Sequence, residues 1–213
     1  MPIDLPPVTR ALLIANVALF LLQQIFPDPI LAHFALWPIG TDFVDPDVGH
    51  VTFEIWQLVS YGFLHGGLTH LFFNMFALWM FGGAIERLFG SRPFATYYLV
   101  CVIGAAVAQL IVVHYFTGGT YPTLGASGGV FGLLLAFGMM FPHQKLMLIF
   151  LPIPIPAWIF VIGYGAIELF QGIAGTQAGV AHFAHLGGMA AGFVMIQYWR
   201  GRLPIKPRRI LTR

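Results

Sequence analysis

Charged side chains are scarce in this sequence, and their scarcity excludes a soluble globular domain. Asp, Glu, Lys and Arg together make up 8% of the 213 residues, whereas a soluble domain normally carries about 25%. Hydrophobic residues make up 58%. This composition indicates an integral membrane protein, and the length suits one compact membrane domain, residues 1–213, with about six spans.

A second cysteine, a signal-peptide cleavage site and an internal repeat are also missing. Cys101 is the only cysteine, so no disulfide forms within the chain. The first apolar run ends in Ile25-Phe26-Pro27-Asp28 rather than in small residues, so we expect a retained helix instead of a signal peptide. The lack of a repeat disfavours a channel or carrier.

Six apolar stretches are predicted to cross the membrane. They lie near residues 11–26, 68–88, 94–116, 127–142, 156–174 and 181–199, and most approach the roughly 20 residues that a spanning helix needs. The proline-rich run 151–156 is expected to begin the fifth helix, because proline is tolerated at a helix start. The predicted fold class is an all-α membrane protein, a bundle of six transmembrane helices.

The placement of charge predicts the orientation of this bundle. With the N-terminus inside, all 10 Lys and Arg residues fall on one side. The other side holds Asp28, Asp42, Asp45, Asp47 and Glu54. Because cytoplasmic loops collect Lys and Arg, both termini are predicted to be cytoplasmic, in a bacterial inner or plasma membrane. The basic tail, about 200–213, is expected to lie against anionic lipid.

One outer connection, residues 27–67, is unusually long. Loops of this length are uncommon unless they are functional. Trp37 and Trp56 within it suit the aromatic belt at the membrane interface. We therefore expect a membrane-associated first loop that lies partly among the outer headgroups.

Polar residues recur at the outer ends of the helices that enter from outside. Helix two carries His70 and Asn74, helix four carries Ser127, and helix six carries His182 and His185. Ionisable and polar groups inside a bilayer are costly, so each is a functional-site hypothesis. Because these groups lie at a similar depth, they are predicted to line one water-filled cavity.

The depth of Ser127 follows from helix geometry. Ser127 and Pro142 are 15 residues apart, or roughly 23 Å along a helix, whereas the hydrocarbon core is about 30 Å thick. Ser127 is therefore predicted to lie below the outer surface. The preceding loop, 117–124, must dip into the protein, and glycines in and after it permit that path.

These residue types suit acyl transfer. A serine hydroxyl such as Ser127 needs an adjacent base to take its proton, and the imidazole of His185 can take and return one near neutral pH. The developing oxyanion needs hydrogen-bond donors, for which His70, Asn74 and the backbone N–H of Ser127 are candidates.

No acidic residue lies in the outer half of helices two, four or six. We therefore expect a Ser127–His185 dyad without an orienting carboxylate. Glu168, in the fifth stretch, is expected to be a buried, hydrogen-bonded carboxyl of unassigned role. His65 and His182 are expected to be structural or to line the cavity.

Motifs in chain order resemble those of the rhomboid family of intramembrane serine proteases. Residues 65–74 (HGGLTHLFFN) and 82–87 (GGAIER) look like the start and end of its second helix. Residues 125–128 (GASG) resemble its nucleophile motif, and residues 184–192 (AHLGGMAAG) resemble its base-bearing sixth helix. Each motif alone is weak, but the ordered set covers almost the whole chain.

This resemblance implies a six-helix enzyme that cleaves transmembrane segments of single-span proteins near their outer end through an acyl-enzyme. By position, Ser127 is the nucleophile, His185 is the general base, and His70 and Asn74 assist the oxyanion. Supporting positions are Gly125, Gly128, Phe131, Gly188 and Gly192, the last two allowing helix six to pack closely on helix four. Residues 27–67 correspond to the family's membrane-lying first loop, and helix five to a gate for substrate.

The partners that the resemblance implies are transmembrane substrates and the lipid bilayer. No cofactor, metal or nucleic acid is expected, and the sequence does not indicate an oligomeric state. Two positions depart from the family pattern: Gln57 follows Trp56 where relatives often have Arg, and Phe131 stands where some have Tyr. A phenyl face can support an imidazole equally well, whereas loss of the Arg charge predicts a different anchoring of the first loop.

Other functions remain open on the sequence. Ser127 and its glycines also fit a GxxxG packing face, Gly128 to Gly132, between membrane helices. His182 and His185, three residues apart, suit a metal site, although zinc hydrolases usually add a carboxylate. A non-catalytic rhomboid-like protein that binds membrane helices is the remaining alternative, and such proteins lose the serine or the histidine.

Overall fold

The structure, a computed structural model, describes residues 5–148, 151–174, 181–205 and 207. In chain order its elements are α1 (Pro7–Ile25), α2 (Pro27–Phe34), β1 (Asp42–Asp45), β2 (Gly49–Thr52), α3 (Gln57–Ser60), η1 (Tyr61–Phe63), α4 (Leu68–Ala77), η2 (Leu78–Gly82), α5 (Gly83–Phe89), α6 (Ser91–Val112), η3 (Val113–Thr117), α7 (Ser127–Met140), β3 (Lys145–Leu148), β4 (Leu151–Pro156), α8 (Ala157–Ala174) and α9 (His182–Trp199). Of the basic tail predicted at about 200–213, residues 206 and 208–213 lie outside the described residues.

All six predicted apolar stretches are helical. In the described part of the chain, four helical segments are long and apolar enough to cross a membrane: Pro7–Ile25, Leu68–Phe89, Ser91–Thr117 and Ala157–Ala174. The second of these joins α4, η2 and α5, and the third joins α6 and η3. Helix α7 is apolar but shorter.

The described part of the chain is mostly helical, as predicted for the fold class, but it also contains two short β-hairpins that the sequence did not predict. Strands β1 and β2 form an antiparallel hairpin in the long first loop, and β3 and β4 form another between α7 and α8. The run 151–156 therefore does not begin the fifth helix, which starts at Ala157. Proline at alternate positions removes backbone donors and holds each preceding residue extended, so this run is a strand.

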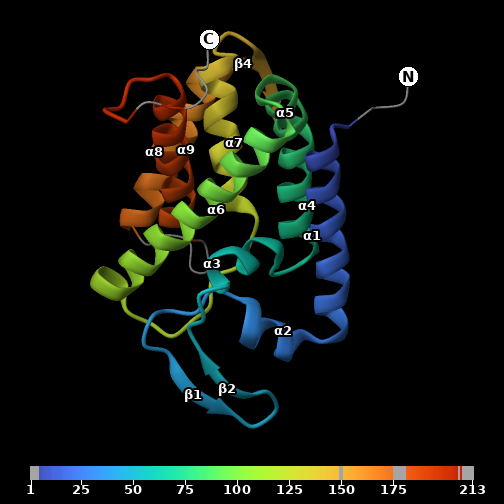
Figure 1. The fold of residues 1–213 in the computed structure, drawn as a ribbon, viewed down its shortest axis with the longest axis vertical. Coiled ribbons are helices and arrows are strands. Elements are labelled where there is room, and N and C mark those ends of the chain that lie inside the picture. Colours follow the sequence, from blue (N-terminus) through green and yellow to red (C-terminus); the bar gives the residue numbers. More distant parts are fainter. Residues whose placement is uncertain (1–4, 149–150, 175–180, 206, 208–213) are drawn as a thin grey trace.

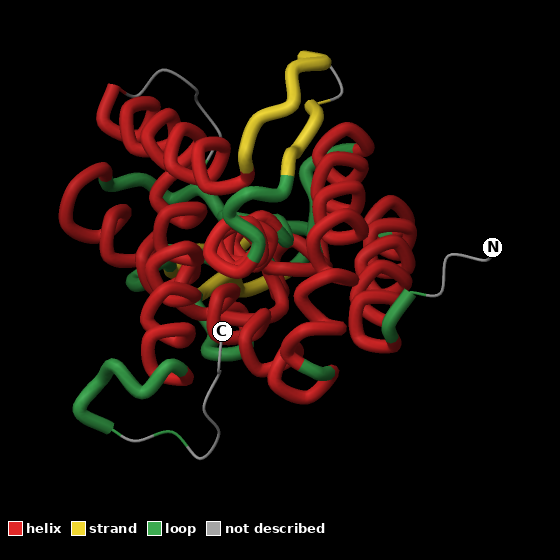
Figure 2. The backbone as a smooth tube through the Cα atoms, turned by 90° about the horizontal axis from the view of Figure 1, so that it is seen from above, coloured by secondary structure: helices red, strands yellow, loops and turns green. Residues whose placement is uncertain are grey.

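Helix α7 occupies the middle of the bundle, and the other helices surround it (Figure 2). Most of its residues are buried. Its glycines permit this position: a Cβ added at Gly129 would lie 2.5 Å from the ring of Tyr98, and one at Gly132 would overlap Cys101. Both neighbours belong to α6, so small residues on α7 bring the two helices close together.

The long first loop gathers α2, β1, β2 and α3 at the end of the bundle opposite to β4 (Figure 1). Fully buried Gln57 joins its parts: Oε1 accepts the Trp37 N–H at 3.1 Å, and Nε2 donates to the carbonyls of Thr52 at 3.1 Å and His33 at 3.4 Å. An arginine has no acceptor for the Trp37 N–H. The neutral amide of Gln57 thus anchors this loop through an acceptor that an arginine at this position would lack.

Buried Glu86 fixes α1 against the rest of the bundle. Its Oε1 accepts the Val8 N–H at 3.0 Å and the Ser91 hydroxyl at 2.7 Å, and its Oε2 accepts the Thr9 N–H at 2.7 Å and the Thr9 hydroxyl at 2.8 Å. Val8 and Thr9 are in the first turn of α1, where the helix dipole favours an anion. One carboxylate thereby supplies the cap that this helix start otherwise lacks.

Replacing Glu86 with alanine is expected to lower the free energy of unfolding by about 3 kcal/mol, because the buried donors of Thr9 lose their partner. Thermal unfolding in detergent measures the change. Asp47→Ala, at an exposed position of the first loop, is the charge-matched control and should unfold like the unchanged protein. Equal midpoints for both variants would contradict this account of α1.

Candidate active site

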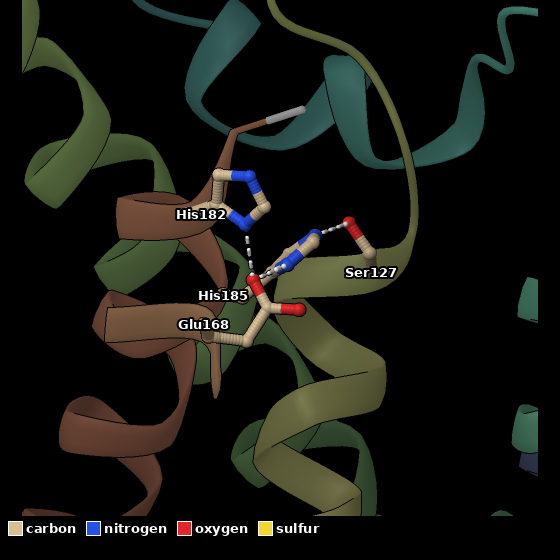
Figure 3. Close-up of polar contacts among 4 residues, drawn as sticks. All are labelled: Ser127, Glu168, His182 and His185. Carbon is tan, nitrogen blue, oxygen red and sulfur yellow. Dashed lines mark hydrogen bonds and ion pairs between the residues drawn. The ribbon is translucent and has the colours of Figure 1, made fainter. Parts of the chain in front are cut away.

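Ser127 and His185 meet across 58 residues of sequence, as the motifs predict. Ser127 is the first residue of α7, and His185 lies in the first turn of α9. The Ser127 Oγ and His185 Nε2 atoms are 2.8 Å apart (Figure 3). Both side chains are only partly buried, so the pair is reachable from the adjoining cavity.

Close contact between α7 and α9 makes this distance possible. A Cβ added at Gly188 would overlap the backbone carbonyl of Gly128, and one at Gly128 would overlap Ala105 of α6. The prediction that Gly188 packs helix six on helix four is therefore confirmed. Gly192 differs from the prediction: an added Cβ there would overlap the Tyr97 hydroxyl, so this glycine faces α6.

Phe131 supports the imidazole of His185 from one face. The two rings are stacked, with centroids 4.2 Å apart and planes 6° from parallel. Phe131 lies one turn after Ser127 on α7, where relatives can have tyrosine. The phenyl ring thus limits rotation of the imidazole, as expected for this position.

A carboxylate contacts the second nitrogen of His185, which contradicts the prediction of a dyad without one. Glu168 of α8 places Oε2 2.8 Å from His185 Nδ1 and 2.8 Å from His182 Nδ1 (Figure 3). The expectation that Glu168 is buried and hydrogen-bonded is confirmed, since 3% of it is exposed. The sequence did not predict its contact with His185, because Glu168 belongs to the fifth apolar stretch and not to helices two, four or six.

Helix geometry contained a signal for this contact. Glu168 lies 11 residues beyond Ala157, where α8 begins, or about 17 Å along the helix. Ser127 lies 13 residues before Met140, where α7 ends, or about 20 Å away. Because β3 and β4 join these ends of the two helices, Glu168 and Ser127 reach a similar depth.

His70 lies beside Gly125, in the loop that leads into Ser127, and one neutral tautomer of its ring is favoured. Its Nδ1 accepts the Gly66 N–H at 3.3 Å, so a neutral ring carries its proton on Nε2. A Cβ added at Gly125 would lie 2.9 Å from this Nε2 and 3.6 Å from Ser127 Oγ. With φ of +133°, Gly125 has a backbone conformation that only glycine adopts readily. A side chain at this position would separate His70 from Ser127.

Asn74 lies one turn beyond His70 on α4. Its Nδ2 donates to the His70 carbonyl at 2.9 Å, which uses one of the two amide hydrogens. Asn74 and the backbone at Ser127 both border the same cavity. As the first residue of α7, Ser127 has a backbone N–H without a partner inside the helix. Both residues therefore border the cavity with a donor that no bond within their own helix uses.

A cavity of about 1490 Å³ connects these groups. Its walls come from α4, α7 and α8, and from the loop Tyr121–Leu124, which the sequence predicted to dip inward. Thr123 holds that loop in place by two backbone hydrogen bonds of 2.9 Å with Leu36 of the first loop. Ser127, His185, His70 and Asn74 therefore share one space, as predicted.

His65 is a structural residue at the edge of the site. Only 1% of it is exposed, and its backbone N–H and carbonyl are both bound by the Gln23 side chain, at 3.1 and 3.0 Å. Burial lowers the pKa of His65 to about 4, so the ring is neutral at physiological pH. Its ring packs edge-on against His70, with centroids 5.1 Å apart, and limits the position of that side chain.

Within the described residues, one cluster has the donor set of a metal site. Glu168, His182 and His185 each offer one atom, and these atoms lie within 4.8 Å of one another. A carboxylate is therefore present at this level, contrary to the prediction from the sequence. However, Oε2 of Glu168 lies at hydrogen-bonding distance from Nδ1 of both His182 and His185, and Nε2 of His185 faces Ser127. These atoms therefore have hydrogen-bond partners within the protein.

Comparison with known proteins gives consistent matches. The Rhomboid domain family matches residues 52–202. The chain is 32% identical over 190 residues to the mitochondrial rhomboid protein 1 of Saccharomyces cerevisiae, covering 85% of this chain and 50% of that protein. It is 28% identical over 199 residues to the rhomboid protease GlpG of Klebsiella pneumoniae, covering 89% of this chain and 62% of GlpG.

A further relative is the rhomboid protease GluP of Bacillus subtilis, 32% identical over 142 residues, or 66% of this chain and 25% of GluP. The chain thus spans 62% or less of the length of these relatives. The region matched by the Rhomboid domain family, residues 52–202, includes Ser127, His185, His70, Asn74 and Glu168.

Substitution of Gly188 by valine is expected to push α9 away from α7 and to separate His185 from Ser127. Labelling of Ser127 by a fluorophosphonate probe should then slow at least tenfold, because the hydroxyl loses its base. Gly163→Ala on α8 is the control, since an added Cβ there meets nothing within 4 Å. Labelling of Gly188→Val at the unchanged rate would show that this contact does not position the pair.

Proposed function

The chain belongs to the rhomboid family of multi-pass membrane proteins, and from this membership we propose that it is an intramembrane serine endopeptidase. Its substrates are single-span membrane proteins, cut near the outer end of their transmembrane segment. The observation that carries the proposal is the 2.8 Å contact between Ser127 Oγ and His185 Nε2 beside a large cavity.

In the proposed topology all six apolar segments cross the bilayer and both termini are cytoplasmic. The charge distribution supports this orientation. Arg87 lies in the last turn of α5, Arg92 in the first turn of α6 and Lys145 in β3, between proposed spans on one side, where cytoplasmic segments collect Lys and Arg. The first loop, at the other end (Figure 1), then lies on the outer side. The active site opens to the outer side, just beneath the headgroups.

The proposed reaction begins when Ser127 Oγ attacks the scissile carbonyl carbon and His185 Nε2 takes the hydroxyl proton. The carbonyl oxygen becomes an oxyanion that the Ser127 N–H, His70 Nε2–H and the Asn74 amide stabilise. Collapse breaks the C–N bond, and His185 returns the proton to the leaving amine. Water from the cavity then hydrolyses the acyl-enzyme, with His185 again as the base.

The cavity supports lateral access of a membrane helix between α4 and α8. Phe73 and Phe76 line it from α4 and Met80 from η2, and Phe160 and Tyr164 line it from α8. These apolar walls suit a transmembrane segment, whose exposed peptide bond must meet polar groups at Ser127. A substrate helix that unwinds at its outer end satisfies both requirements, since unpaired peptide groups are tolerated only where they line a polar cavity.

We expect purified protein to cleave a tagged single-span substrate in liposomes, and Ser127→Ala and His185→Ala to reduce the rate at least a thousandfold, because each removes one partner of the proton transfer. Gel analysis of the fragments measures the rates. Thermal unfolding should be unchanged in both variants.

Two outcomes distinguish the alternative functions. No cutting by any of the three proteins would favour a non-catalytic protein that binds membrane helices, and equal cutting by all three would exclude the Ser127–His185 mechanism. Loss of cleavage on addition of a metal chelator would favour a metal enzyme built on Glu168, His182 and His185, whereas the serine mechanism predicts no effect of the chelator.

The oxyanion donors are tested separately. His70→Ala and Asn74→Ala are each expected to lower kcat by about 10- to 1000-fold with little change in KM, because one donor to the transition state is lost. Steady-state cleavage kinetics measure both constants. A change confined to KM would place these side chains in substrate binding instead.

A further inference from the structure

We propose that Glu168 is a positioning residue, so that the reaction runs on a Ser127–His185–Glu168 triad, with His182 holding the carboxylate. This inference rests on the proposed protease function and adds a member to its machinery on a third helix, α8. The observation that carries it is the pair of 2.8 Å contacts that Glu168 Oε2 makes with the two rings.

The contact with Glu168 determines which nitrogen of His185 can act as base. A carboxylate only accepts hydrogen bonds, so His185 Nδ1 must carry a proton to be 2.8 Å from Glu168 Oε2. A neutral ring protonated at Nδ1 has its lone pair on Nε2. That atom faces the Ser127 hydroxyl at 2.8 Å. Glu168 thereby holds the one neutral tautomer that can take the serine proton.

His182 fixes the carboxylate itself. Its Nδ1 lies 2.8 Å from the same oxygen, and 5% of His182 is exposed. A buried carboxylate is costly unless its oxygens receive hydrogen bonds. Two N–H donors on Oε2 meet that need, and Oε1 points away from both rings (Figure 3). His182 thus stabilises Glu168 in the rotamer that reaches His185.

Glu168 also acts when charge develops. Once His185 has taken the serine proton it is an imidazolium, and an adjacent carboxylate stabilises that cation without taking a proton from it. The Phe131 ring, stacked on the imidazole, prevents the ring from turning away. The imidazole is therefore constrained by its two nitrogen partners and by one face.

The position of α8 affects both the cavity and the contact between Glu168 and His185. Helix α8 forms one wall of the cavity, and Glu168 borders it. Displacement of α8 by an incoming segment changes the distance from Glu168 to His185. The position of α8 is thus part of the catalytic geometry as well as of the access route.

The test compares Glu168→Gln and Glu168→Ala in the full chain, in liposomes. Glutamine keeps an acceptor oxygen for both rings and loses the charge, whereas alanine loses both. We expect kcat to fall about 10-fold in Glu168→Gln and about 100-fold or more in Glu168→Ala, with KM changed less than about twofold. Glu54→Gln, which removes the same charge from the first loop, should match the unchanged protein.

Chemical rescue separates positioning from packing. Added formate is expected to restore part of the kcat of Glu168→Ala, because a free carboxylate can enter from the cavity and accept from His185. Formate should not affect Ser127→Ala. A packing role predicts a lower unfolding temperature, a normal kcat in isosteric Glu168→Gln, and no rescue, and that combination overturns the inference.

The outcomes also separate this inference from the proposed function. If the unchanged protein cleaves, Ser127→Ala does not, and both Glu168 variants cleave at the unchanged rate, the protease function stands and the positioning role fails. If Ser127→Ala cleaves like the unchanged protein, the protease mechanism itself fails.

Discussion

The hydrogen bond between Ser127 Oγ and His185 Nε2 is the interaction on which the chemistry of the site depends. It joins the first turns of two helices, α7 and α9, and it forms only because Gly188 lies against the backbone of Gly128. Tight packing of small residues is a common way to bring membrane helices together. Here the same packing sets the distance between two reactive side chains, so the glycines and the polar pair form one arrangement.

Burial in an apolar bundle constrains every other polar group of the site. Glu168, His182 and His185 share hydrogen bonds, Gln23 binds the backbone of His65, and His70 accepts from Gly66. An unpaired polar group in this medium is costly, so each side chain has few alternatives to its observed position. The partners that reduce this cost also fix the tautomers and ring orientations that proton transfer requires.

The helices and the central pair could be predicted from sequence, whereas several contacts could not. Apolar runs and ordered motifs place Ser127 and His185 at the starts of two helices, because those signals are local. The lengths of α7 and α8 also indicate the depth of Glu168, but its contact with His185 and the Tyr97 neighbour of Gly192 depend on how the helices are oriented against one another. No local pattern encodes that orientation. The strand at Leu151–Pro156 does have a local signal, because proline at alternate positions favours extended backbone.

Trapping of the covalent intermediate tests the central claim most directly. Purified protein is mixed with a single-span substrate, quenched in acid during turnover and digested for peptide mapping by mass spectrometry. The account predicts that the peptide containing Ser127 gains the mass of the amino-terminal substrate fragment, and that His185→Ala shows no such gain. Rapid cleavage with no adduct on Ser127, or an adduct on another residue, would contradict it.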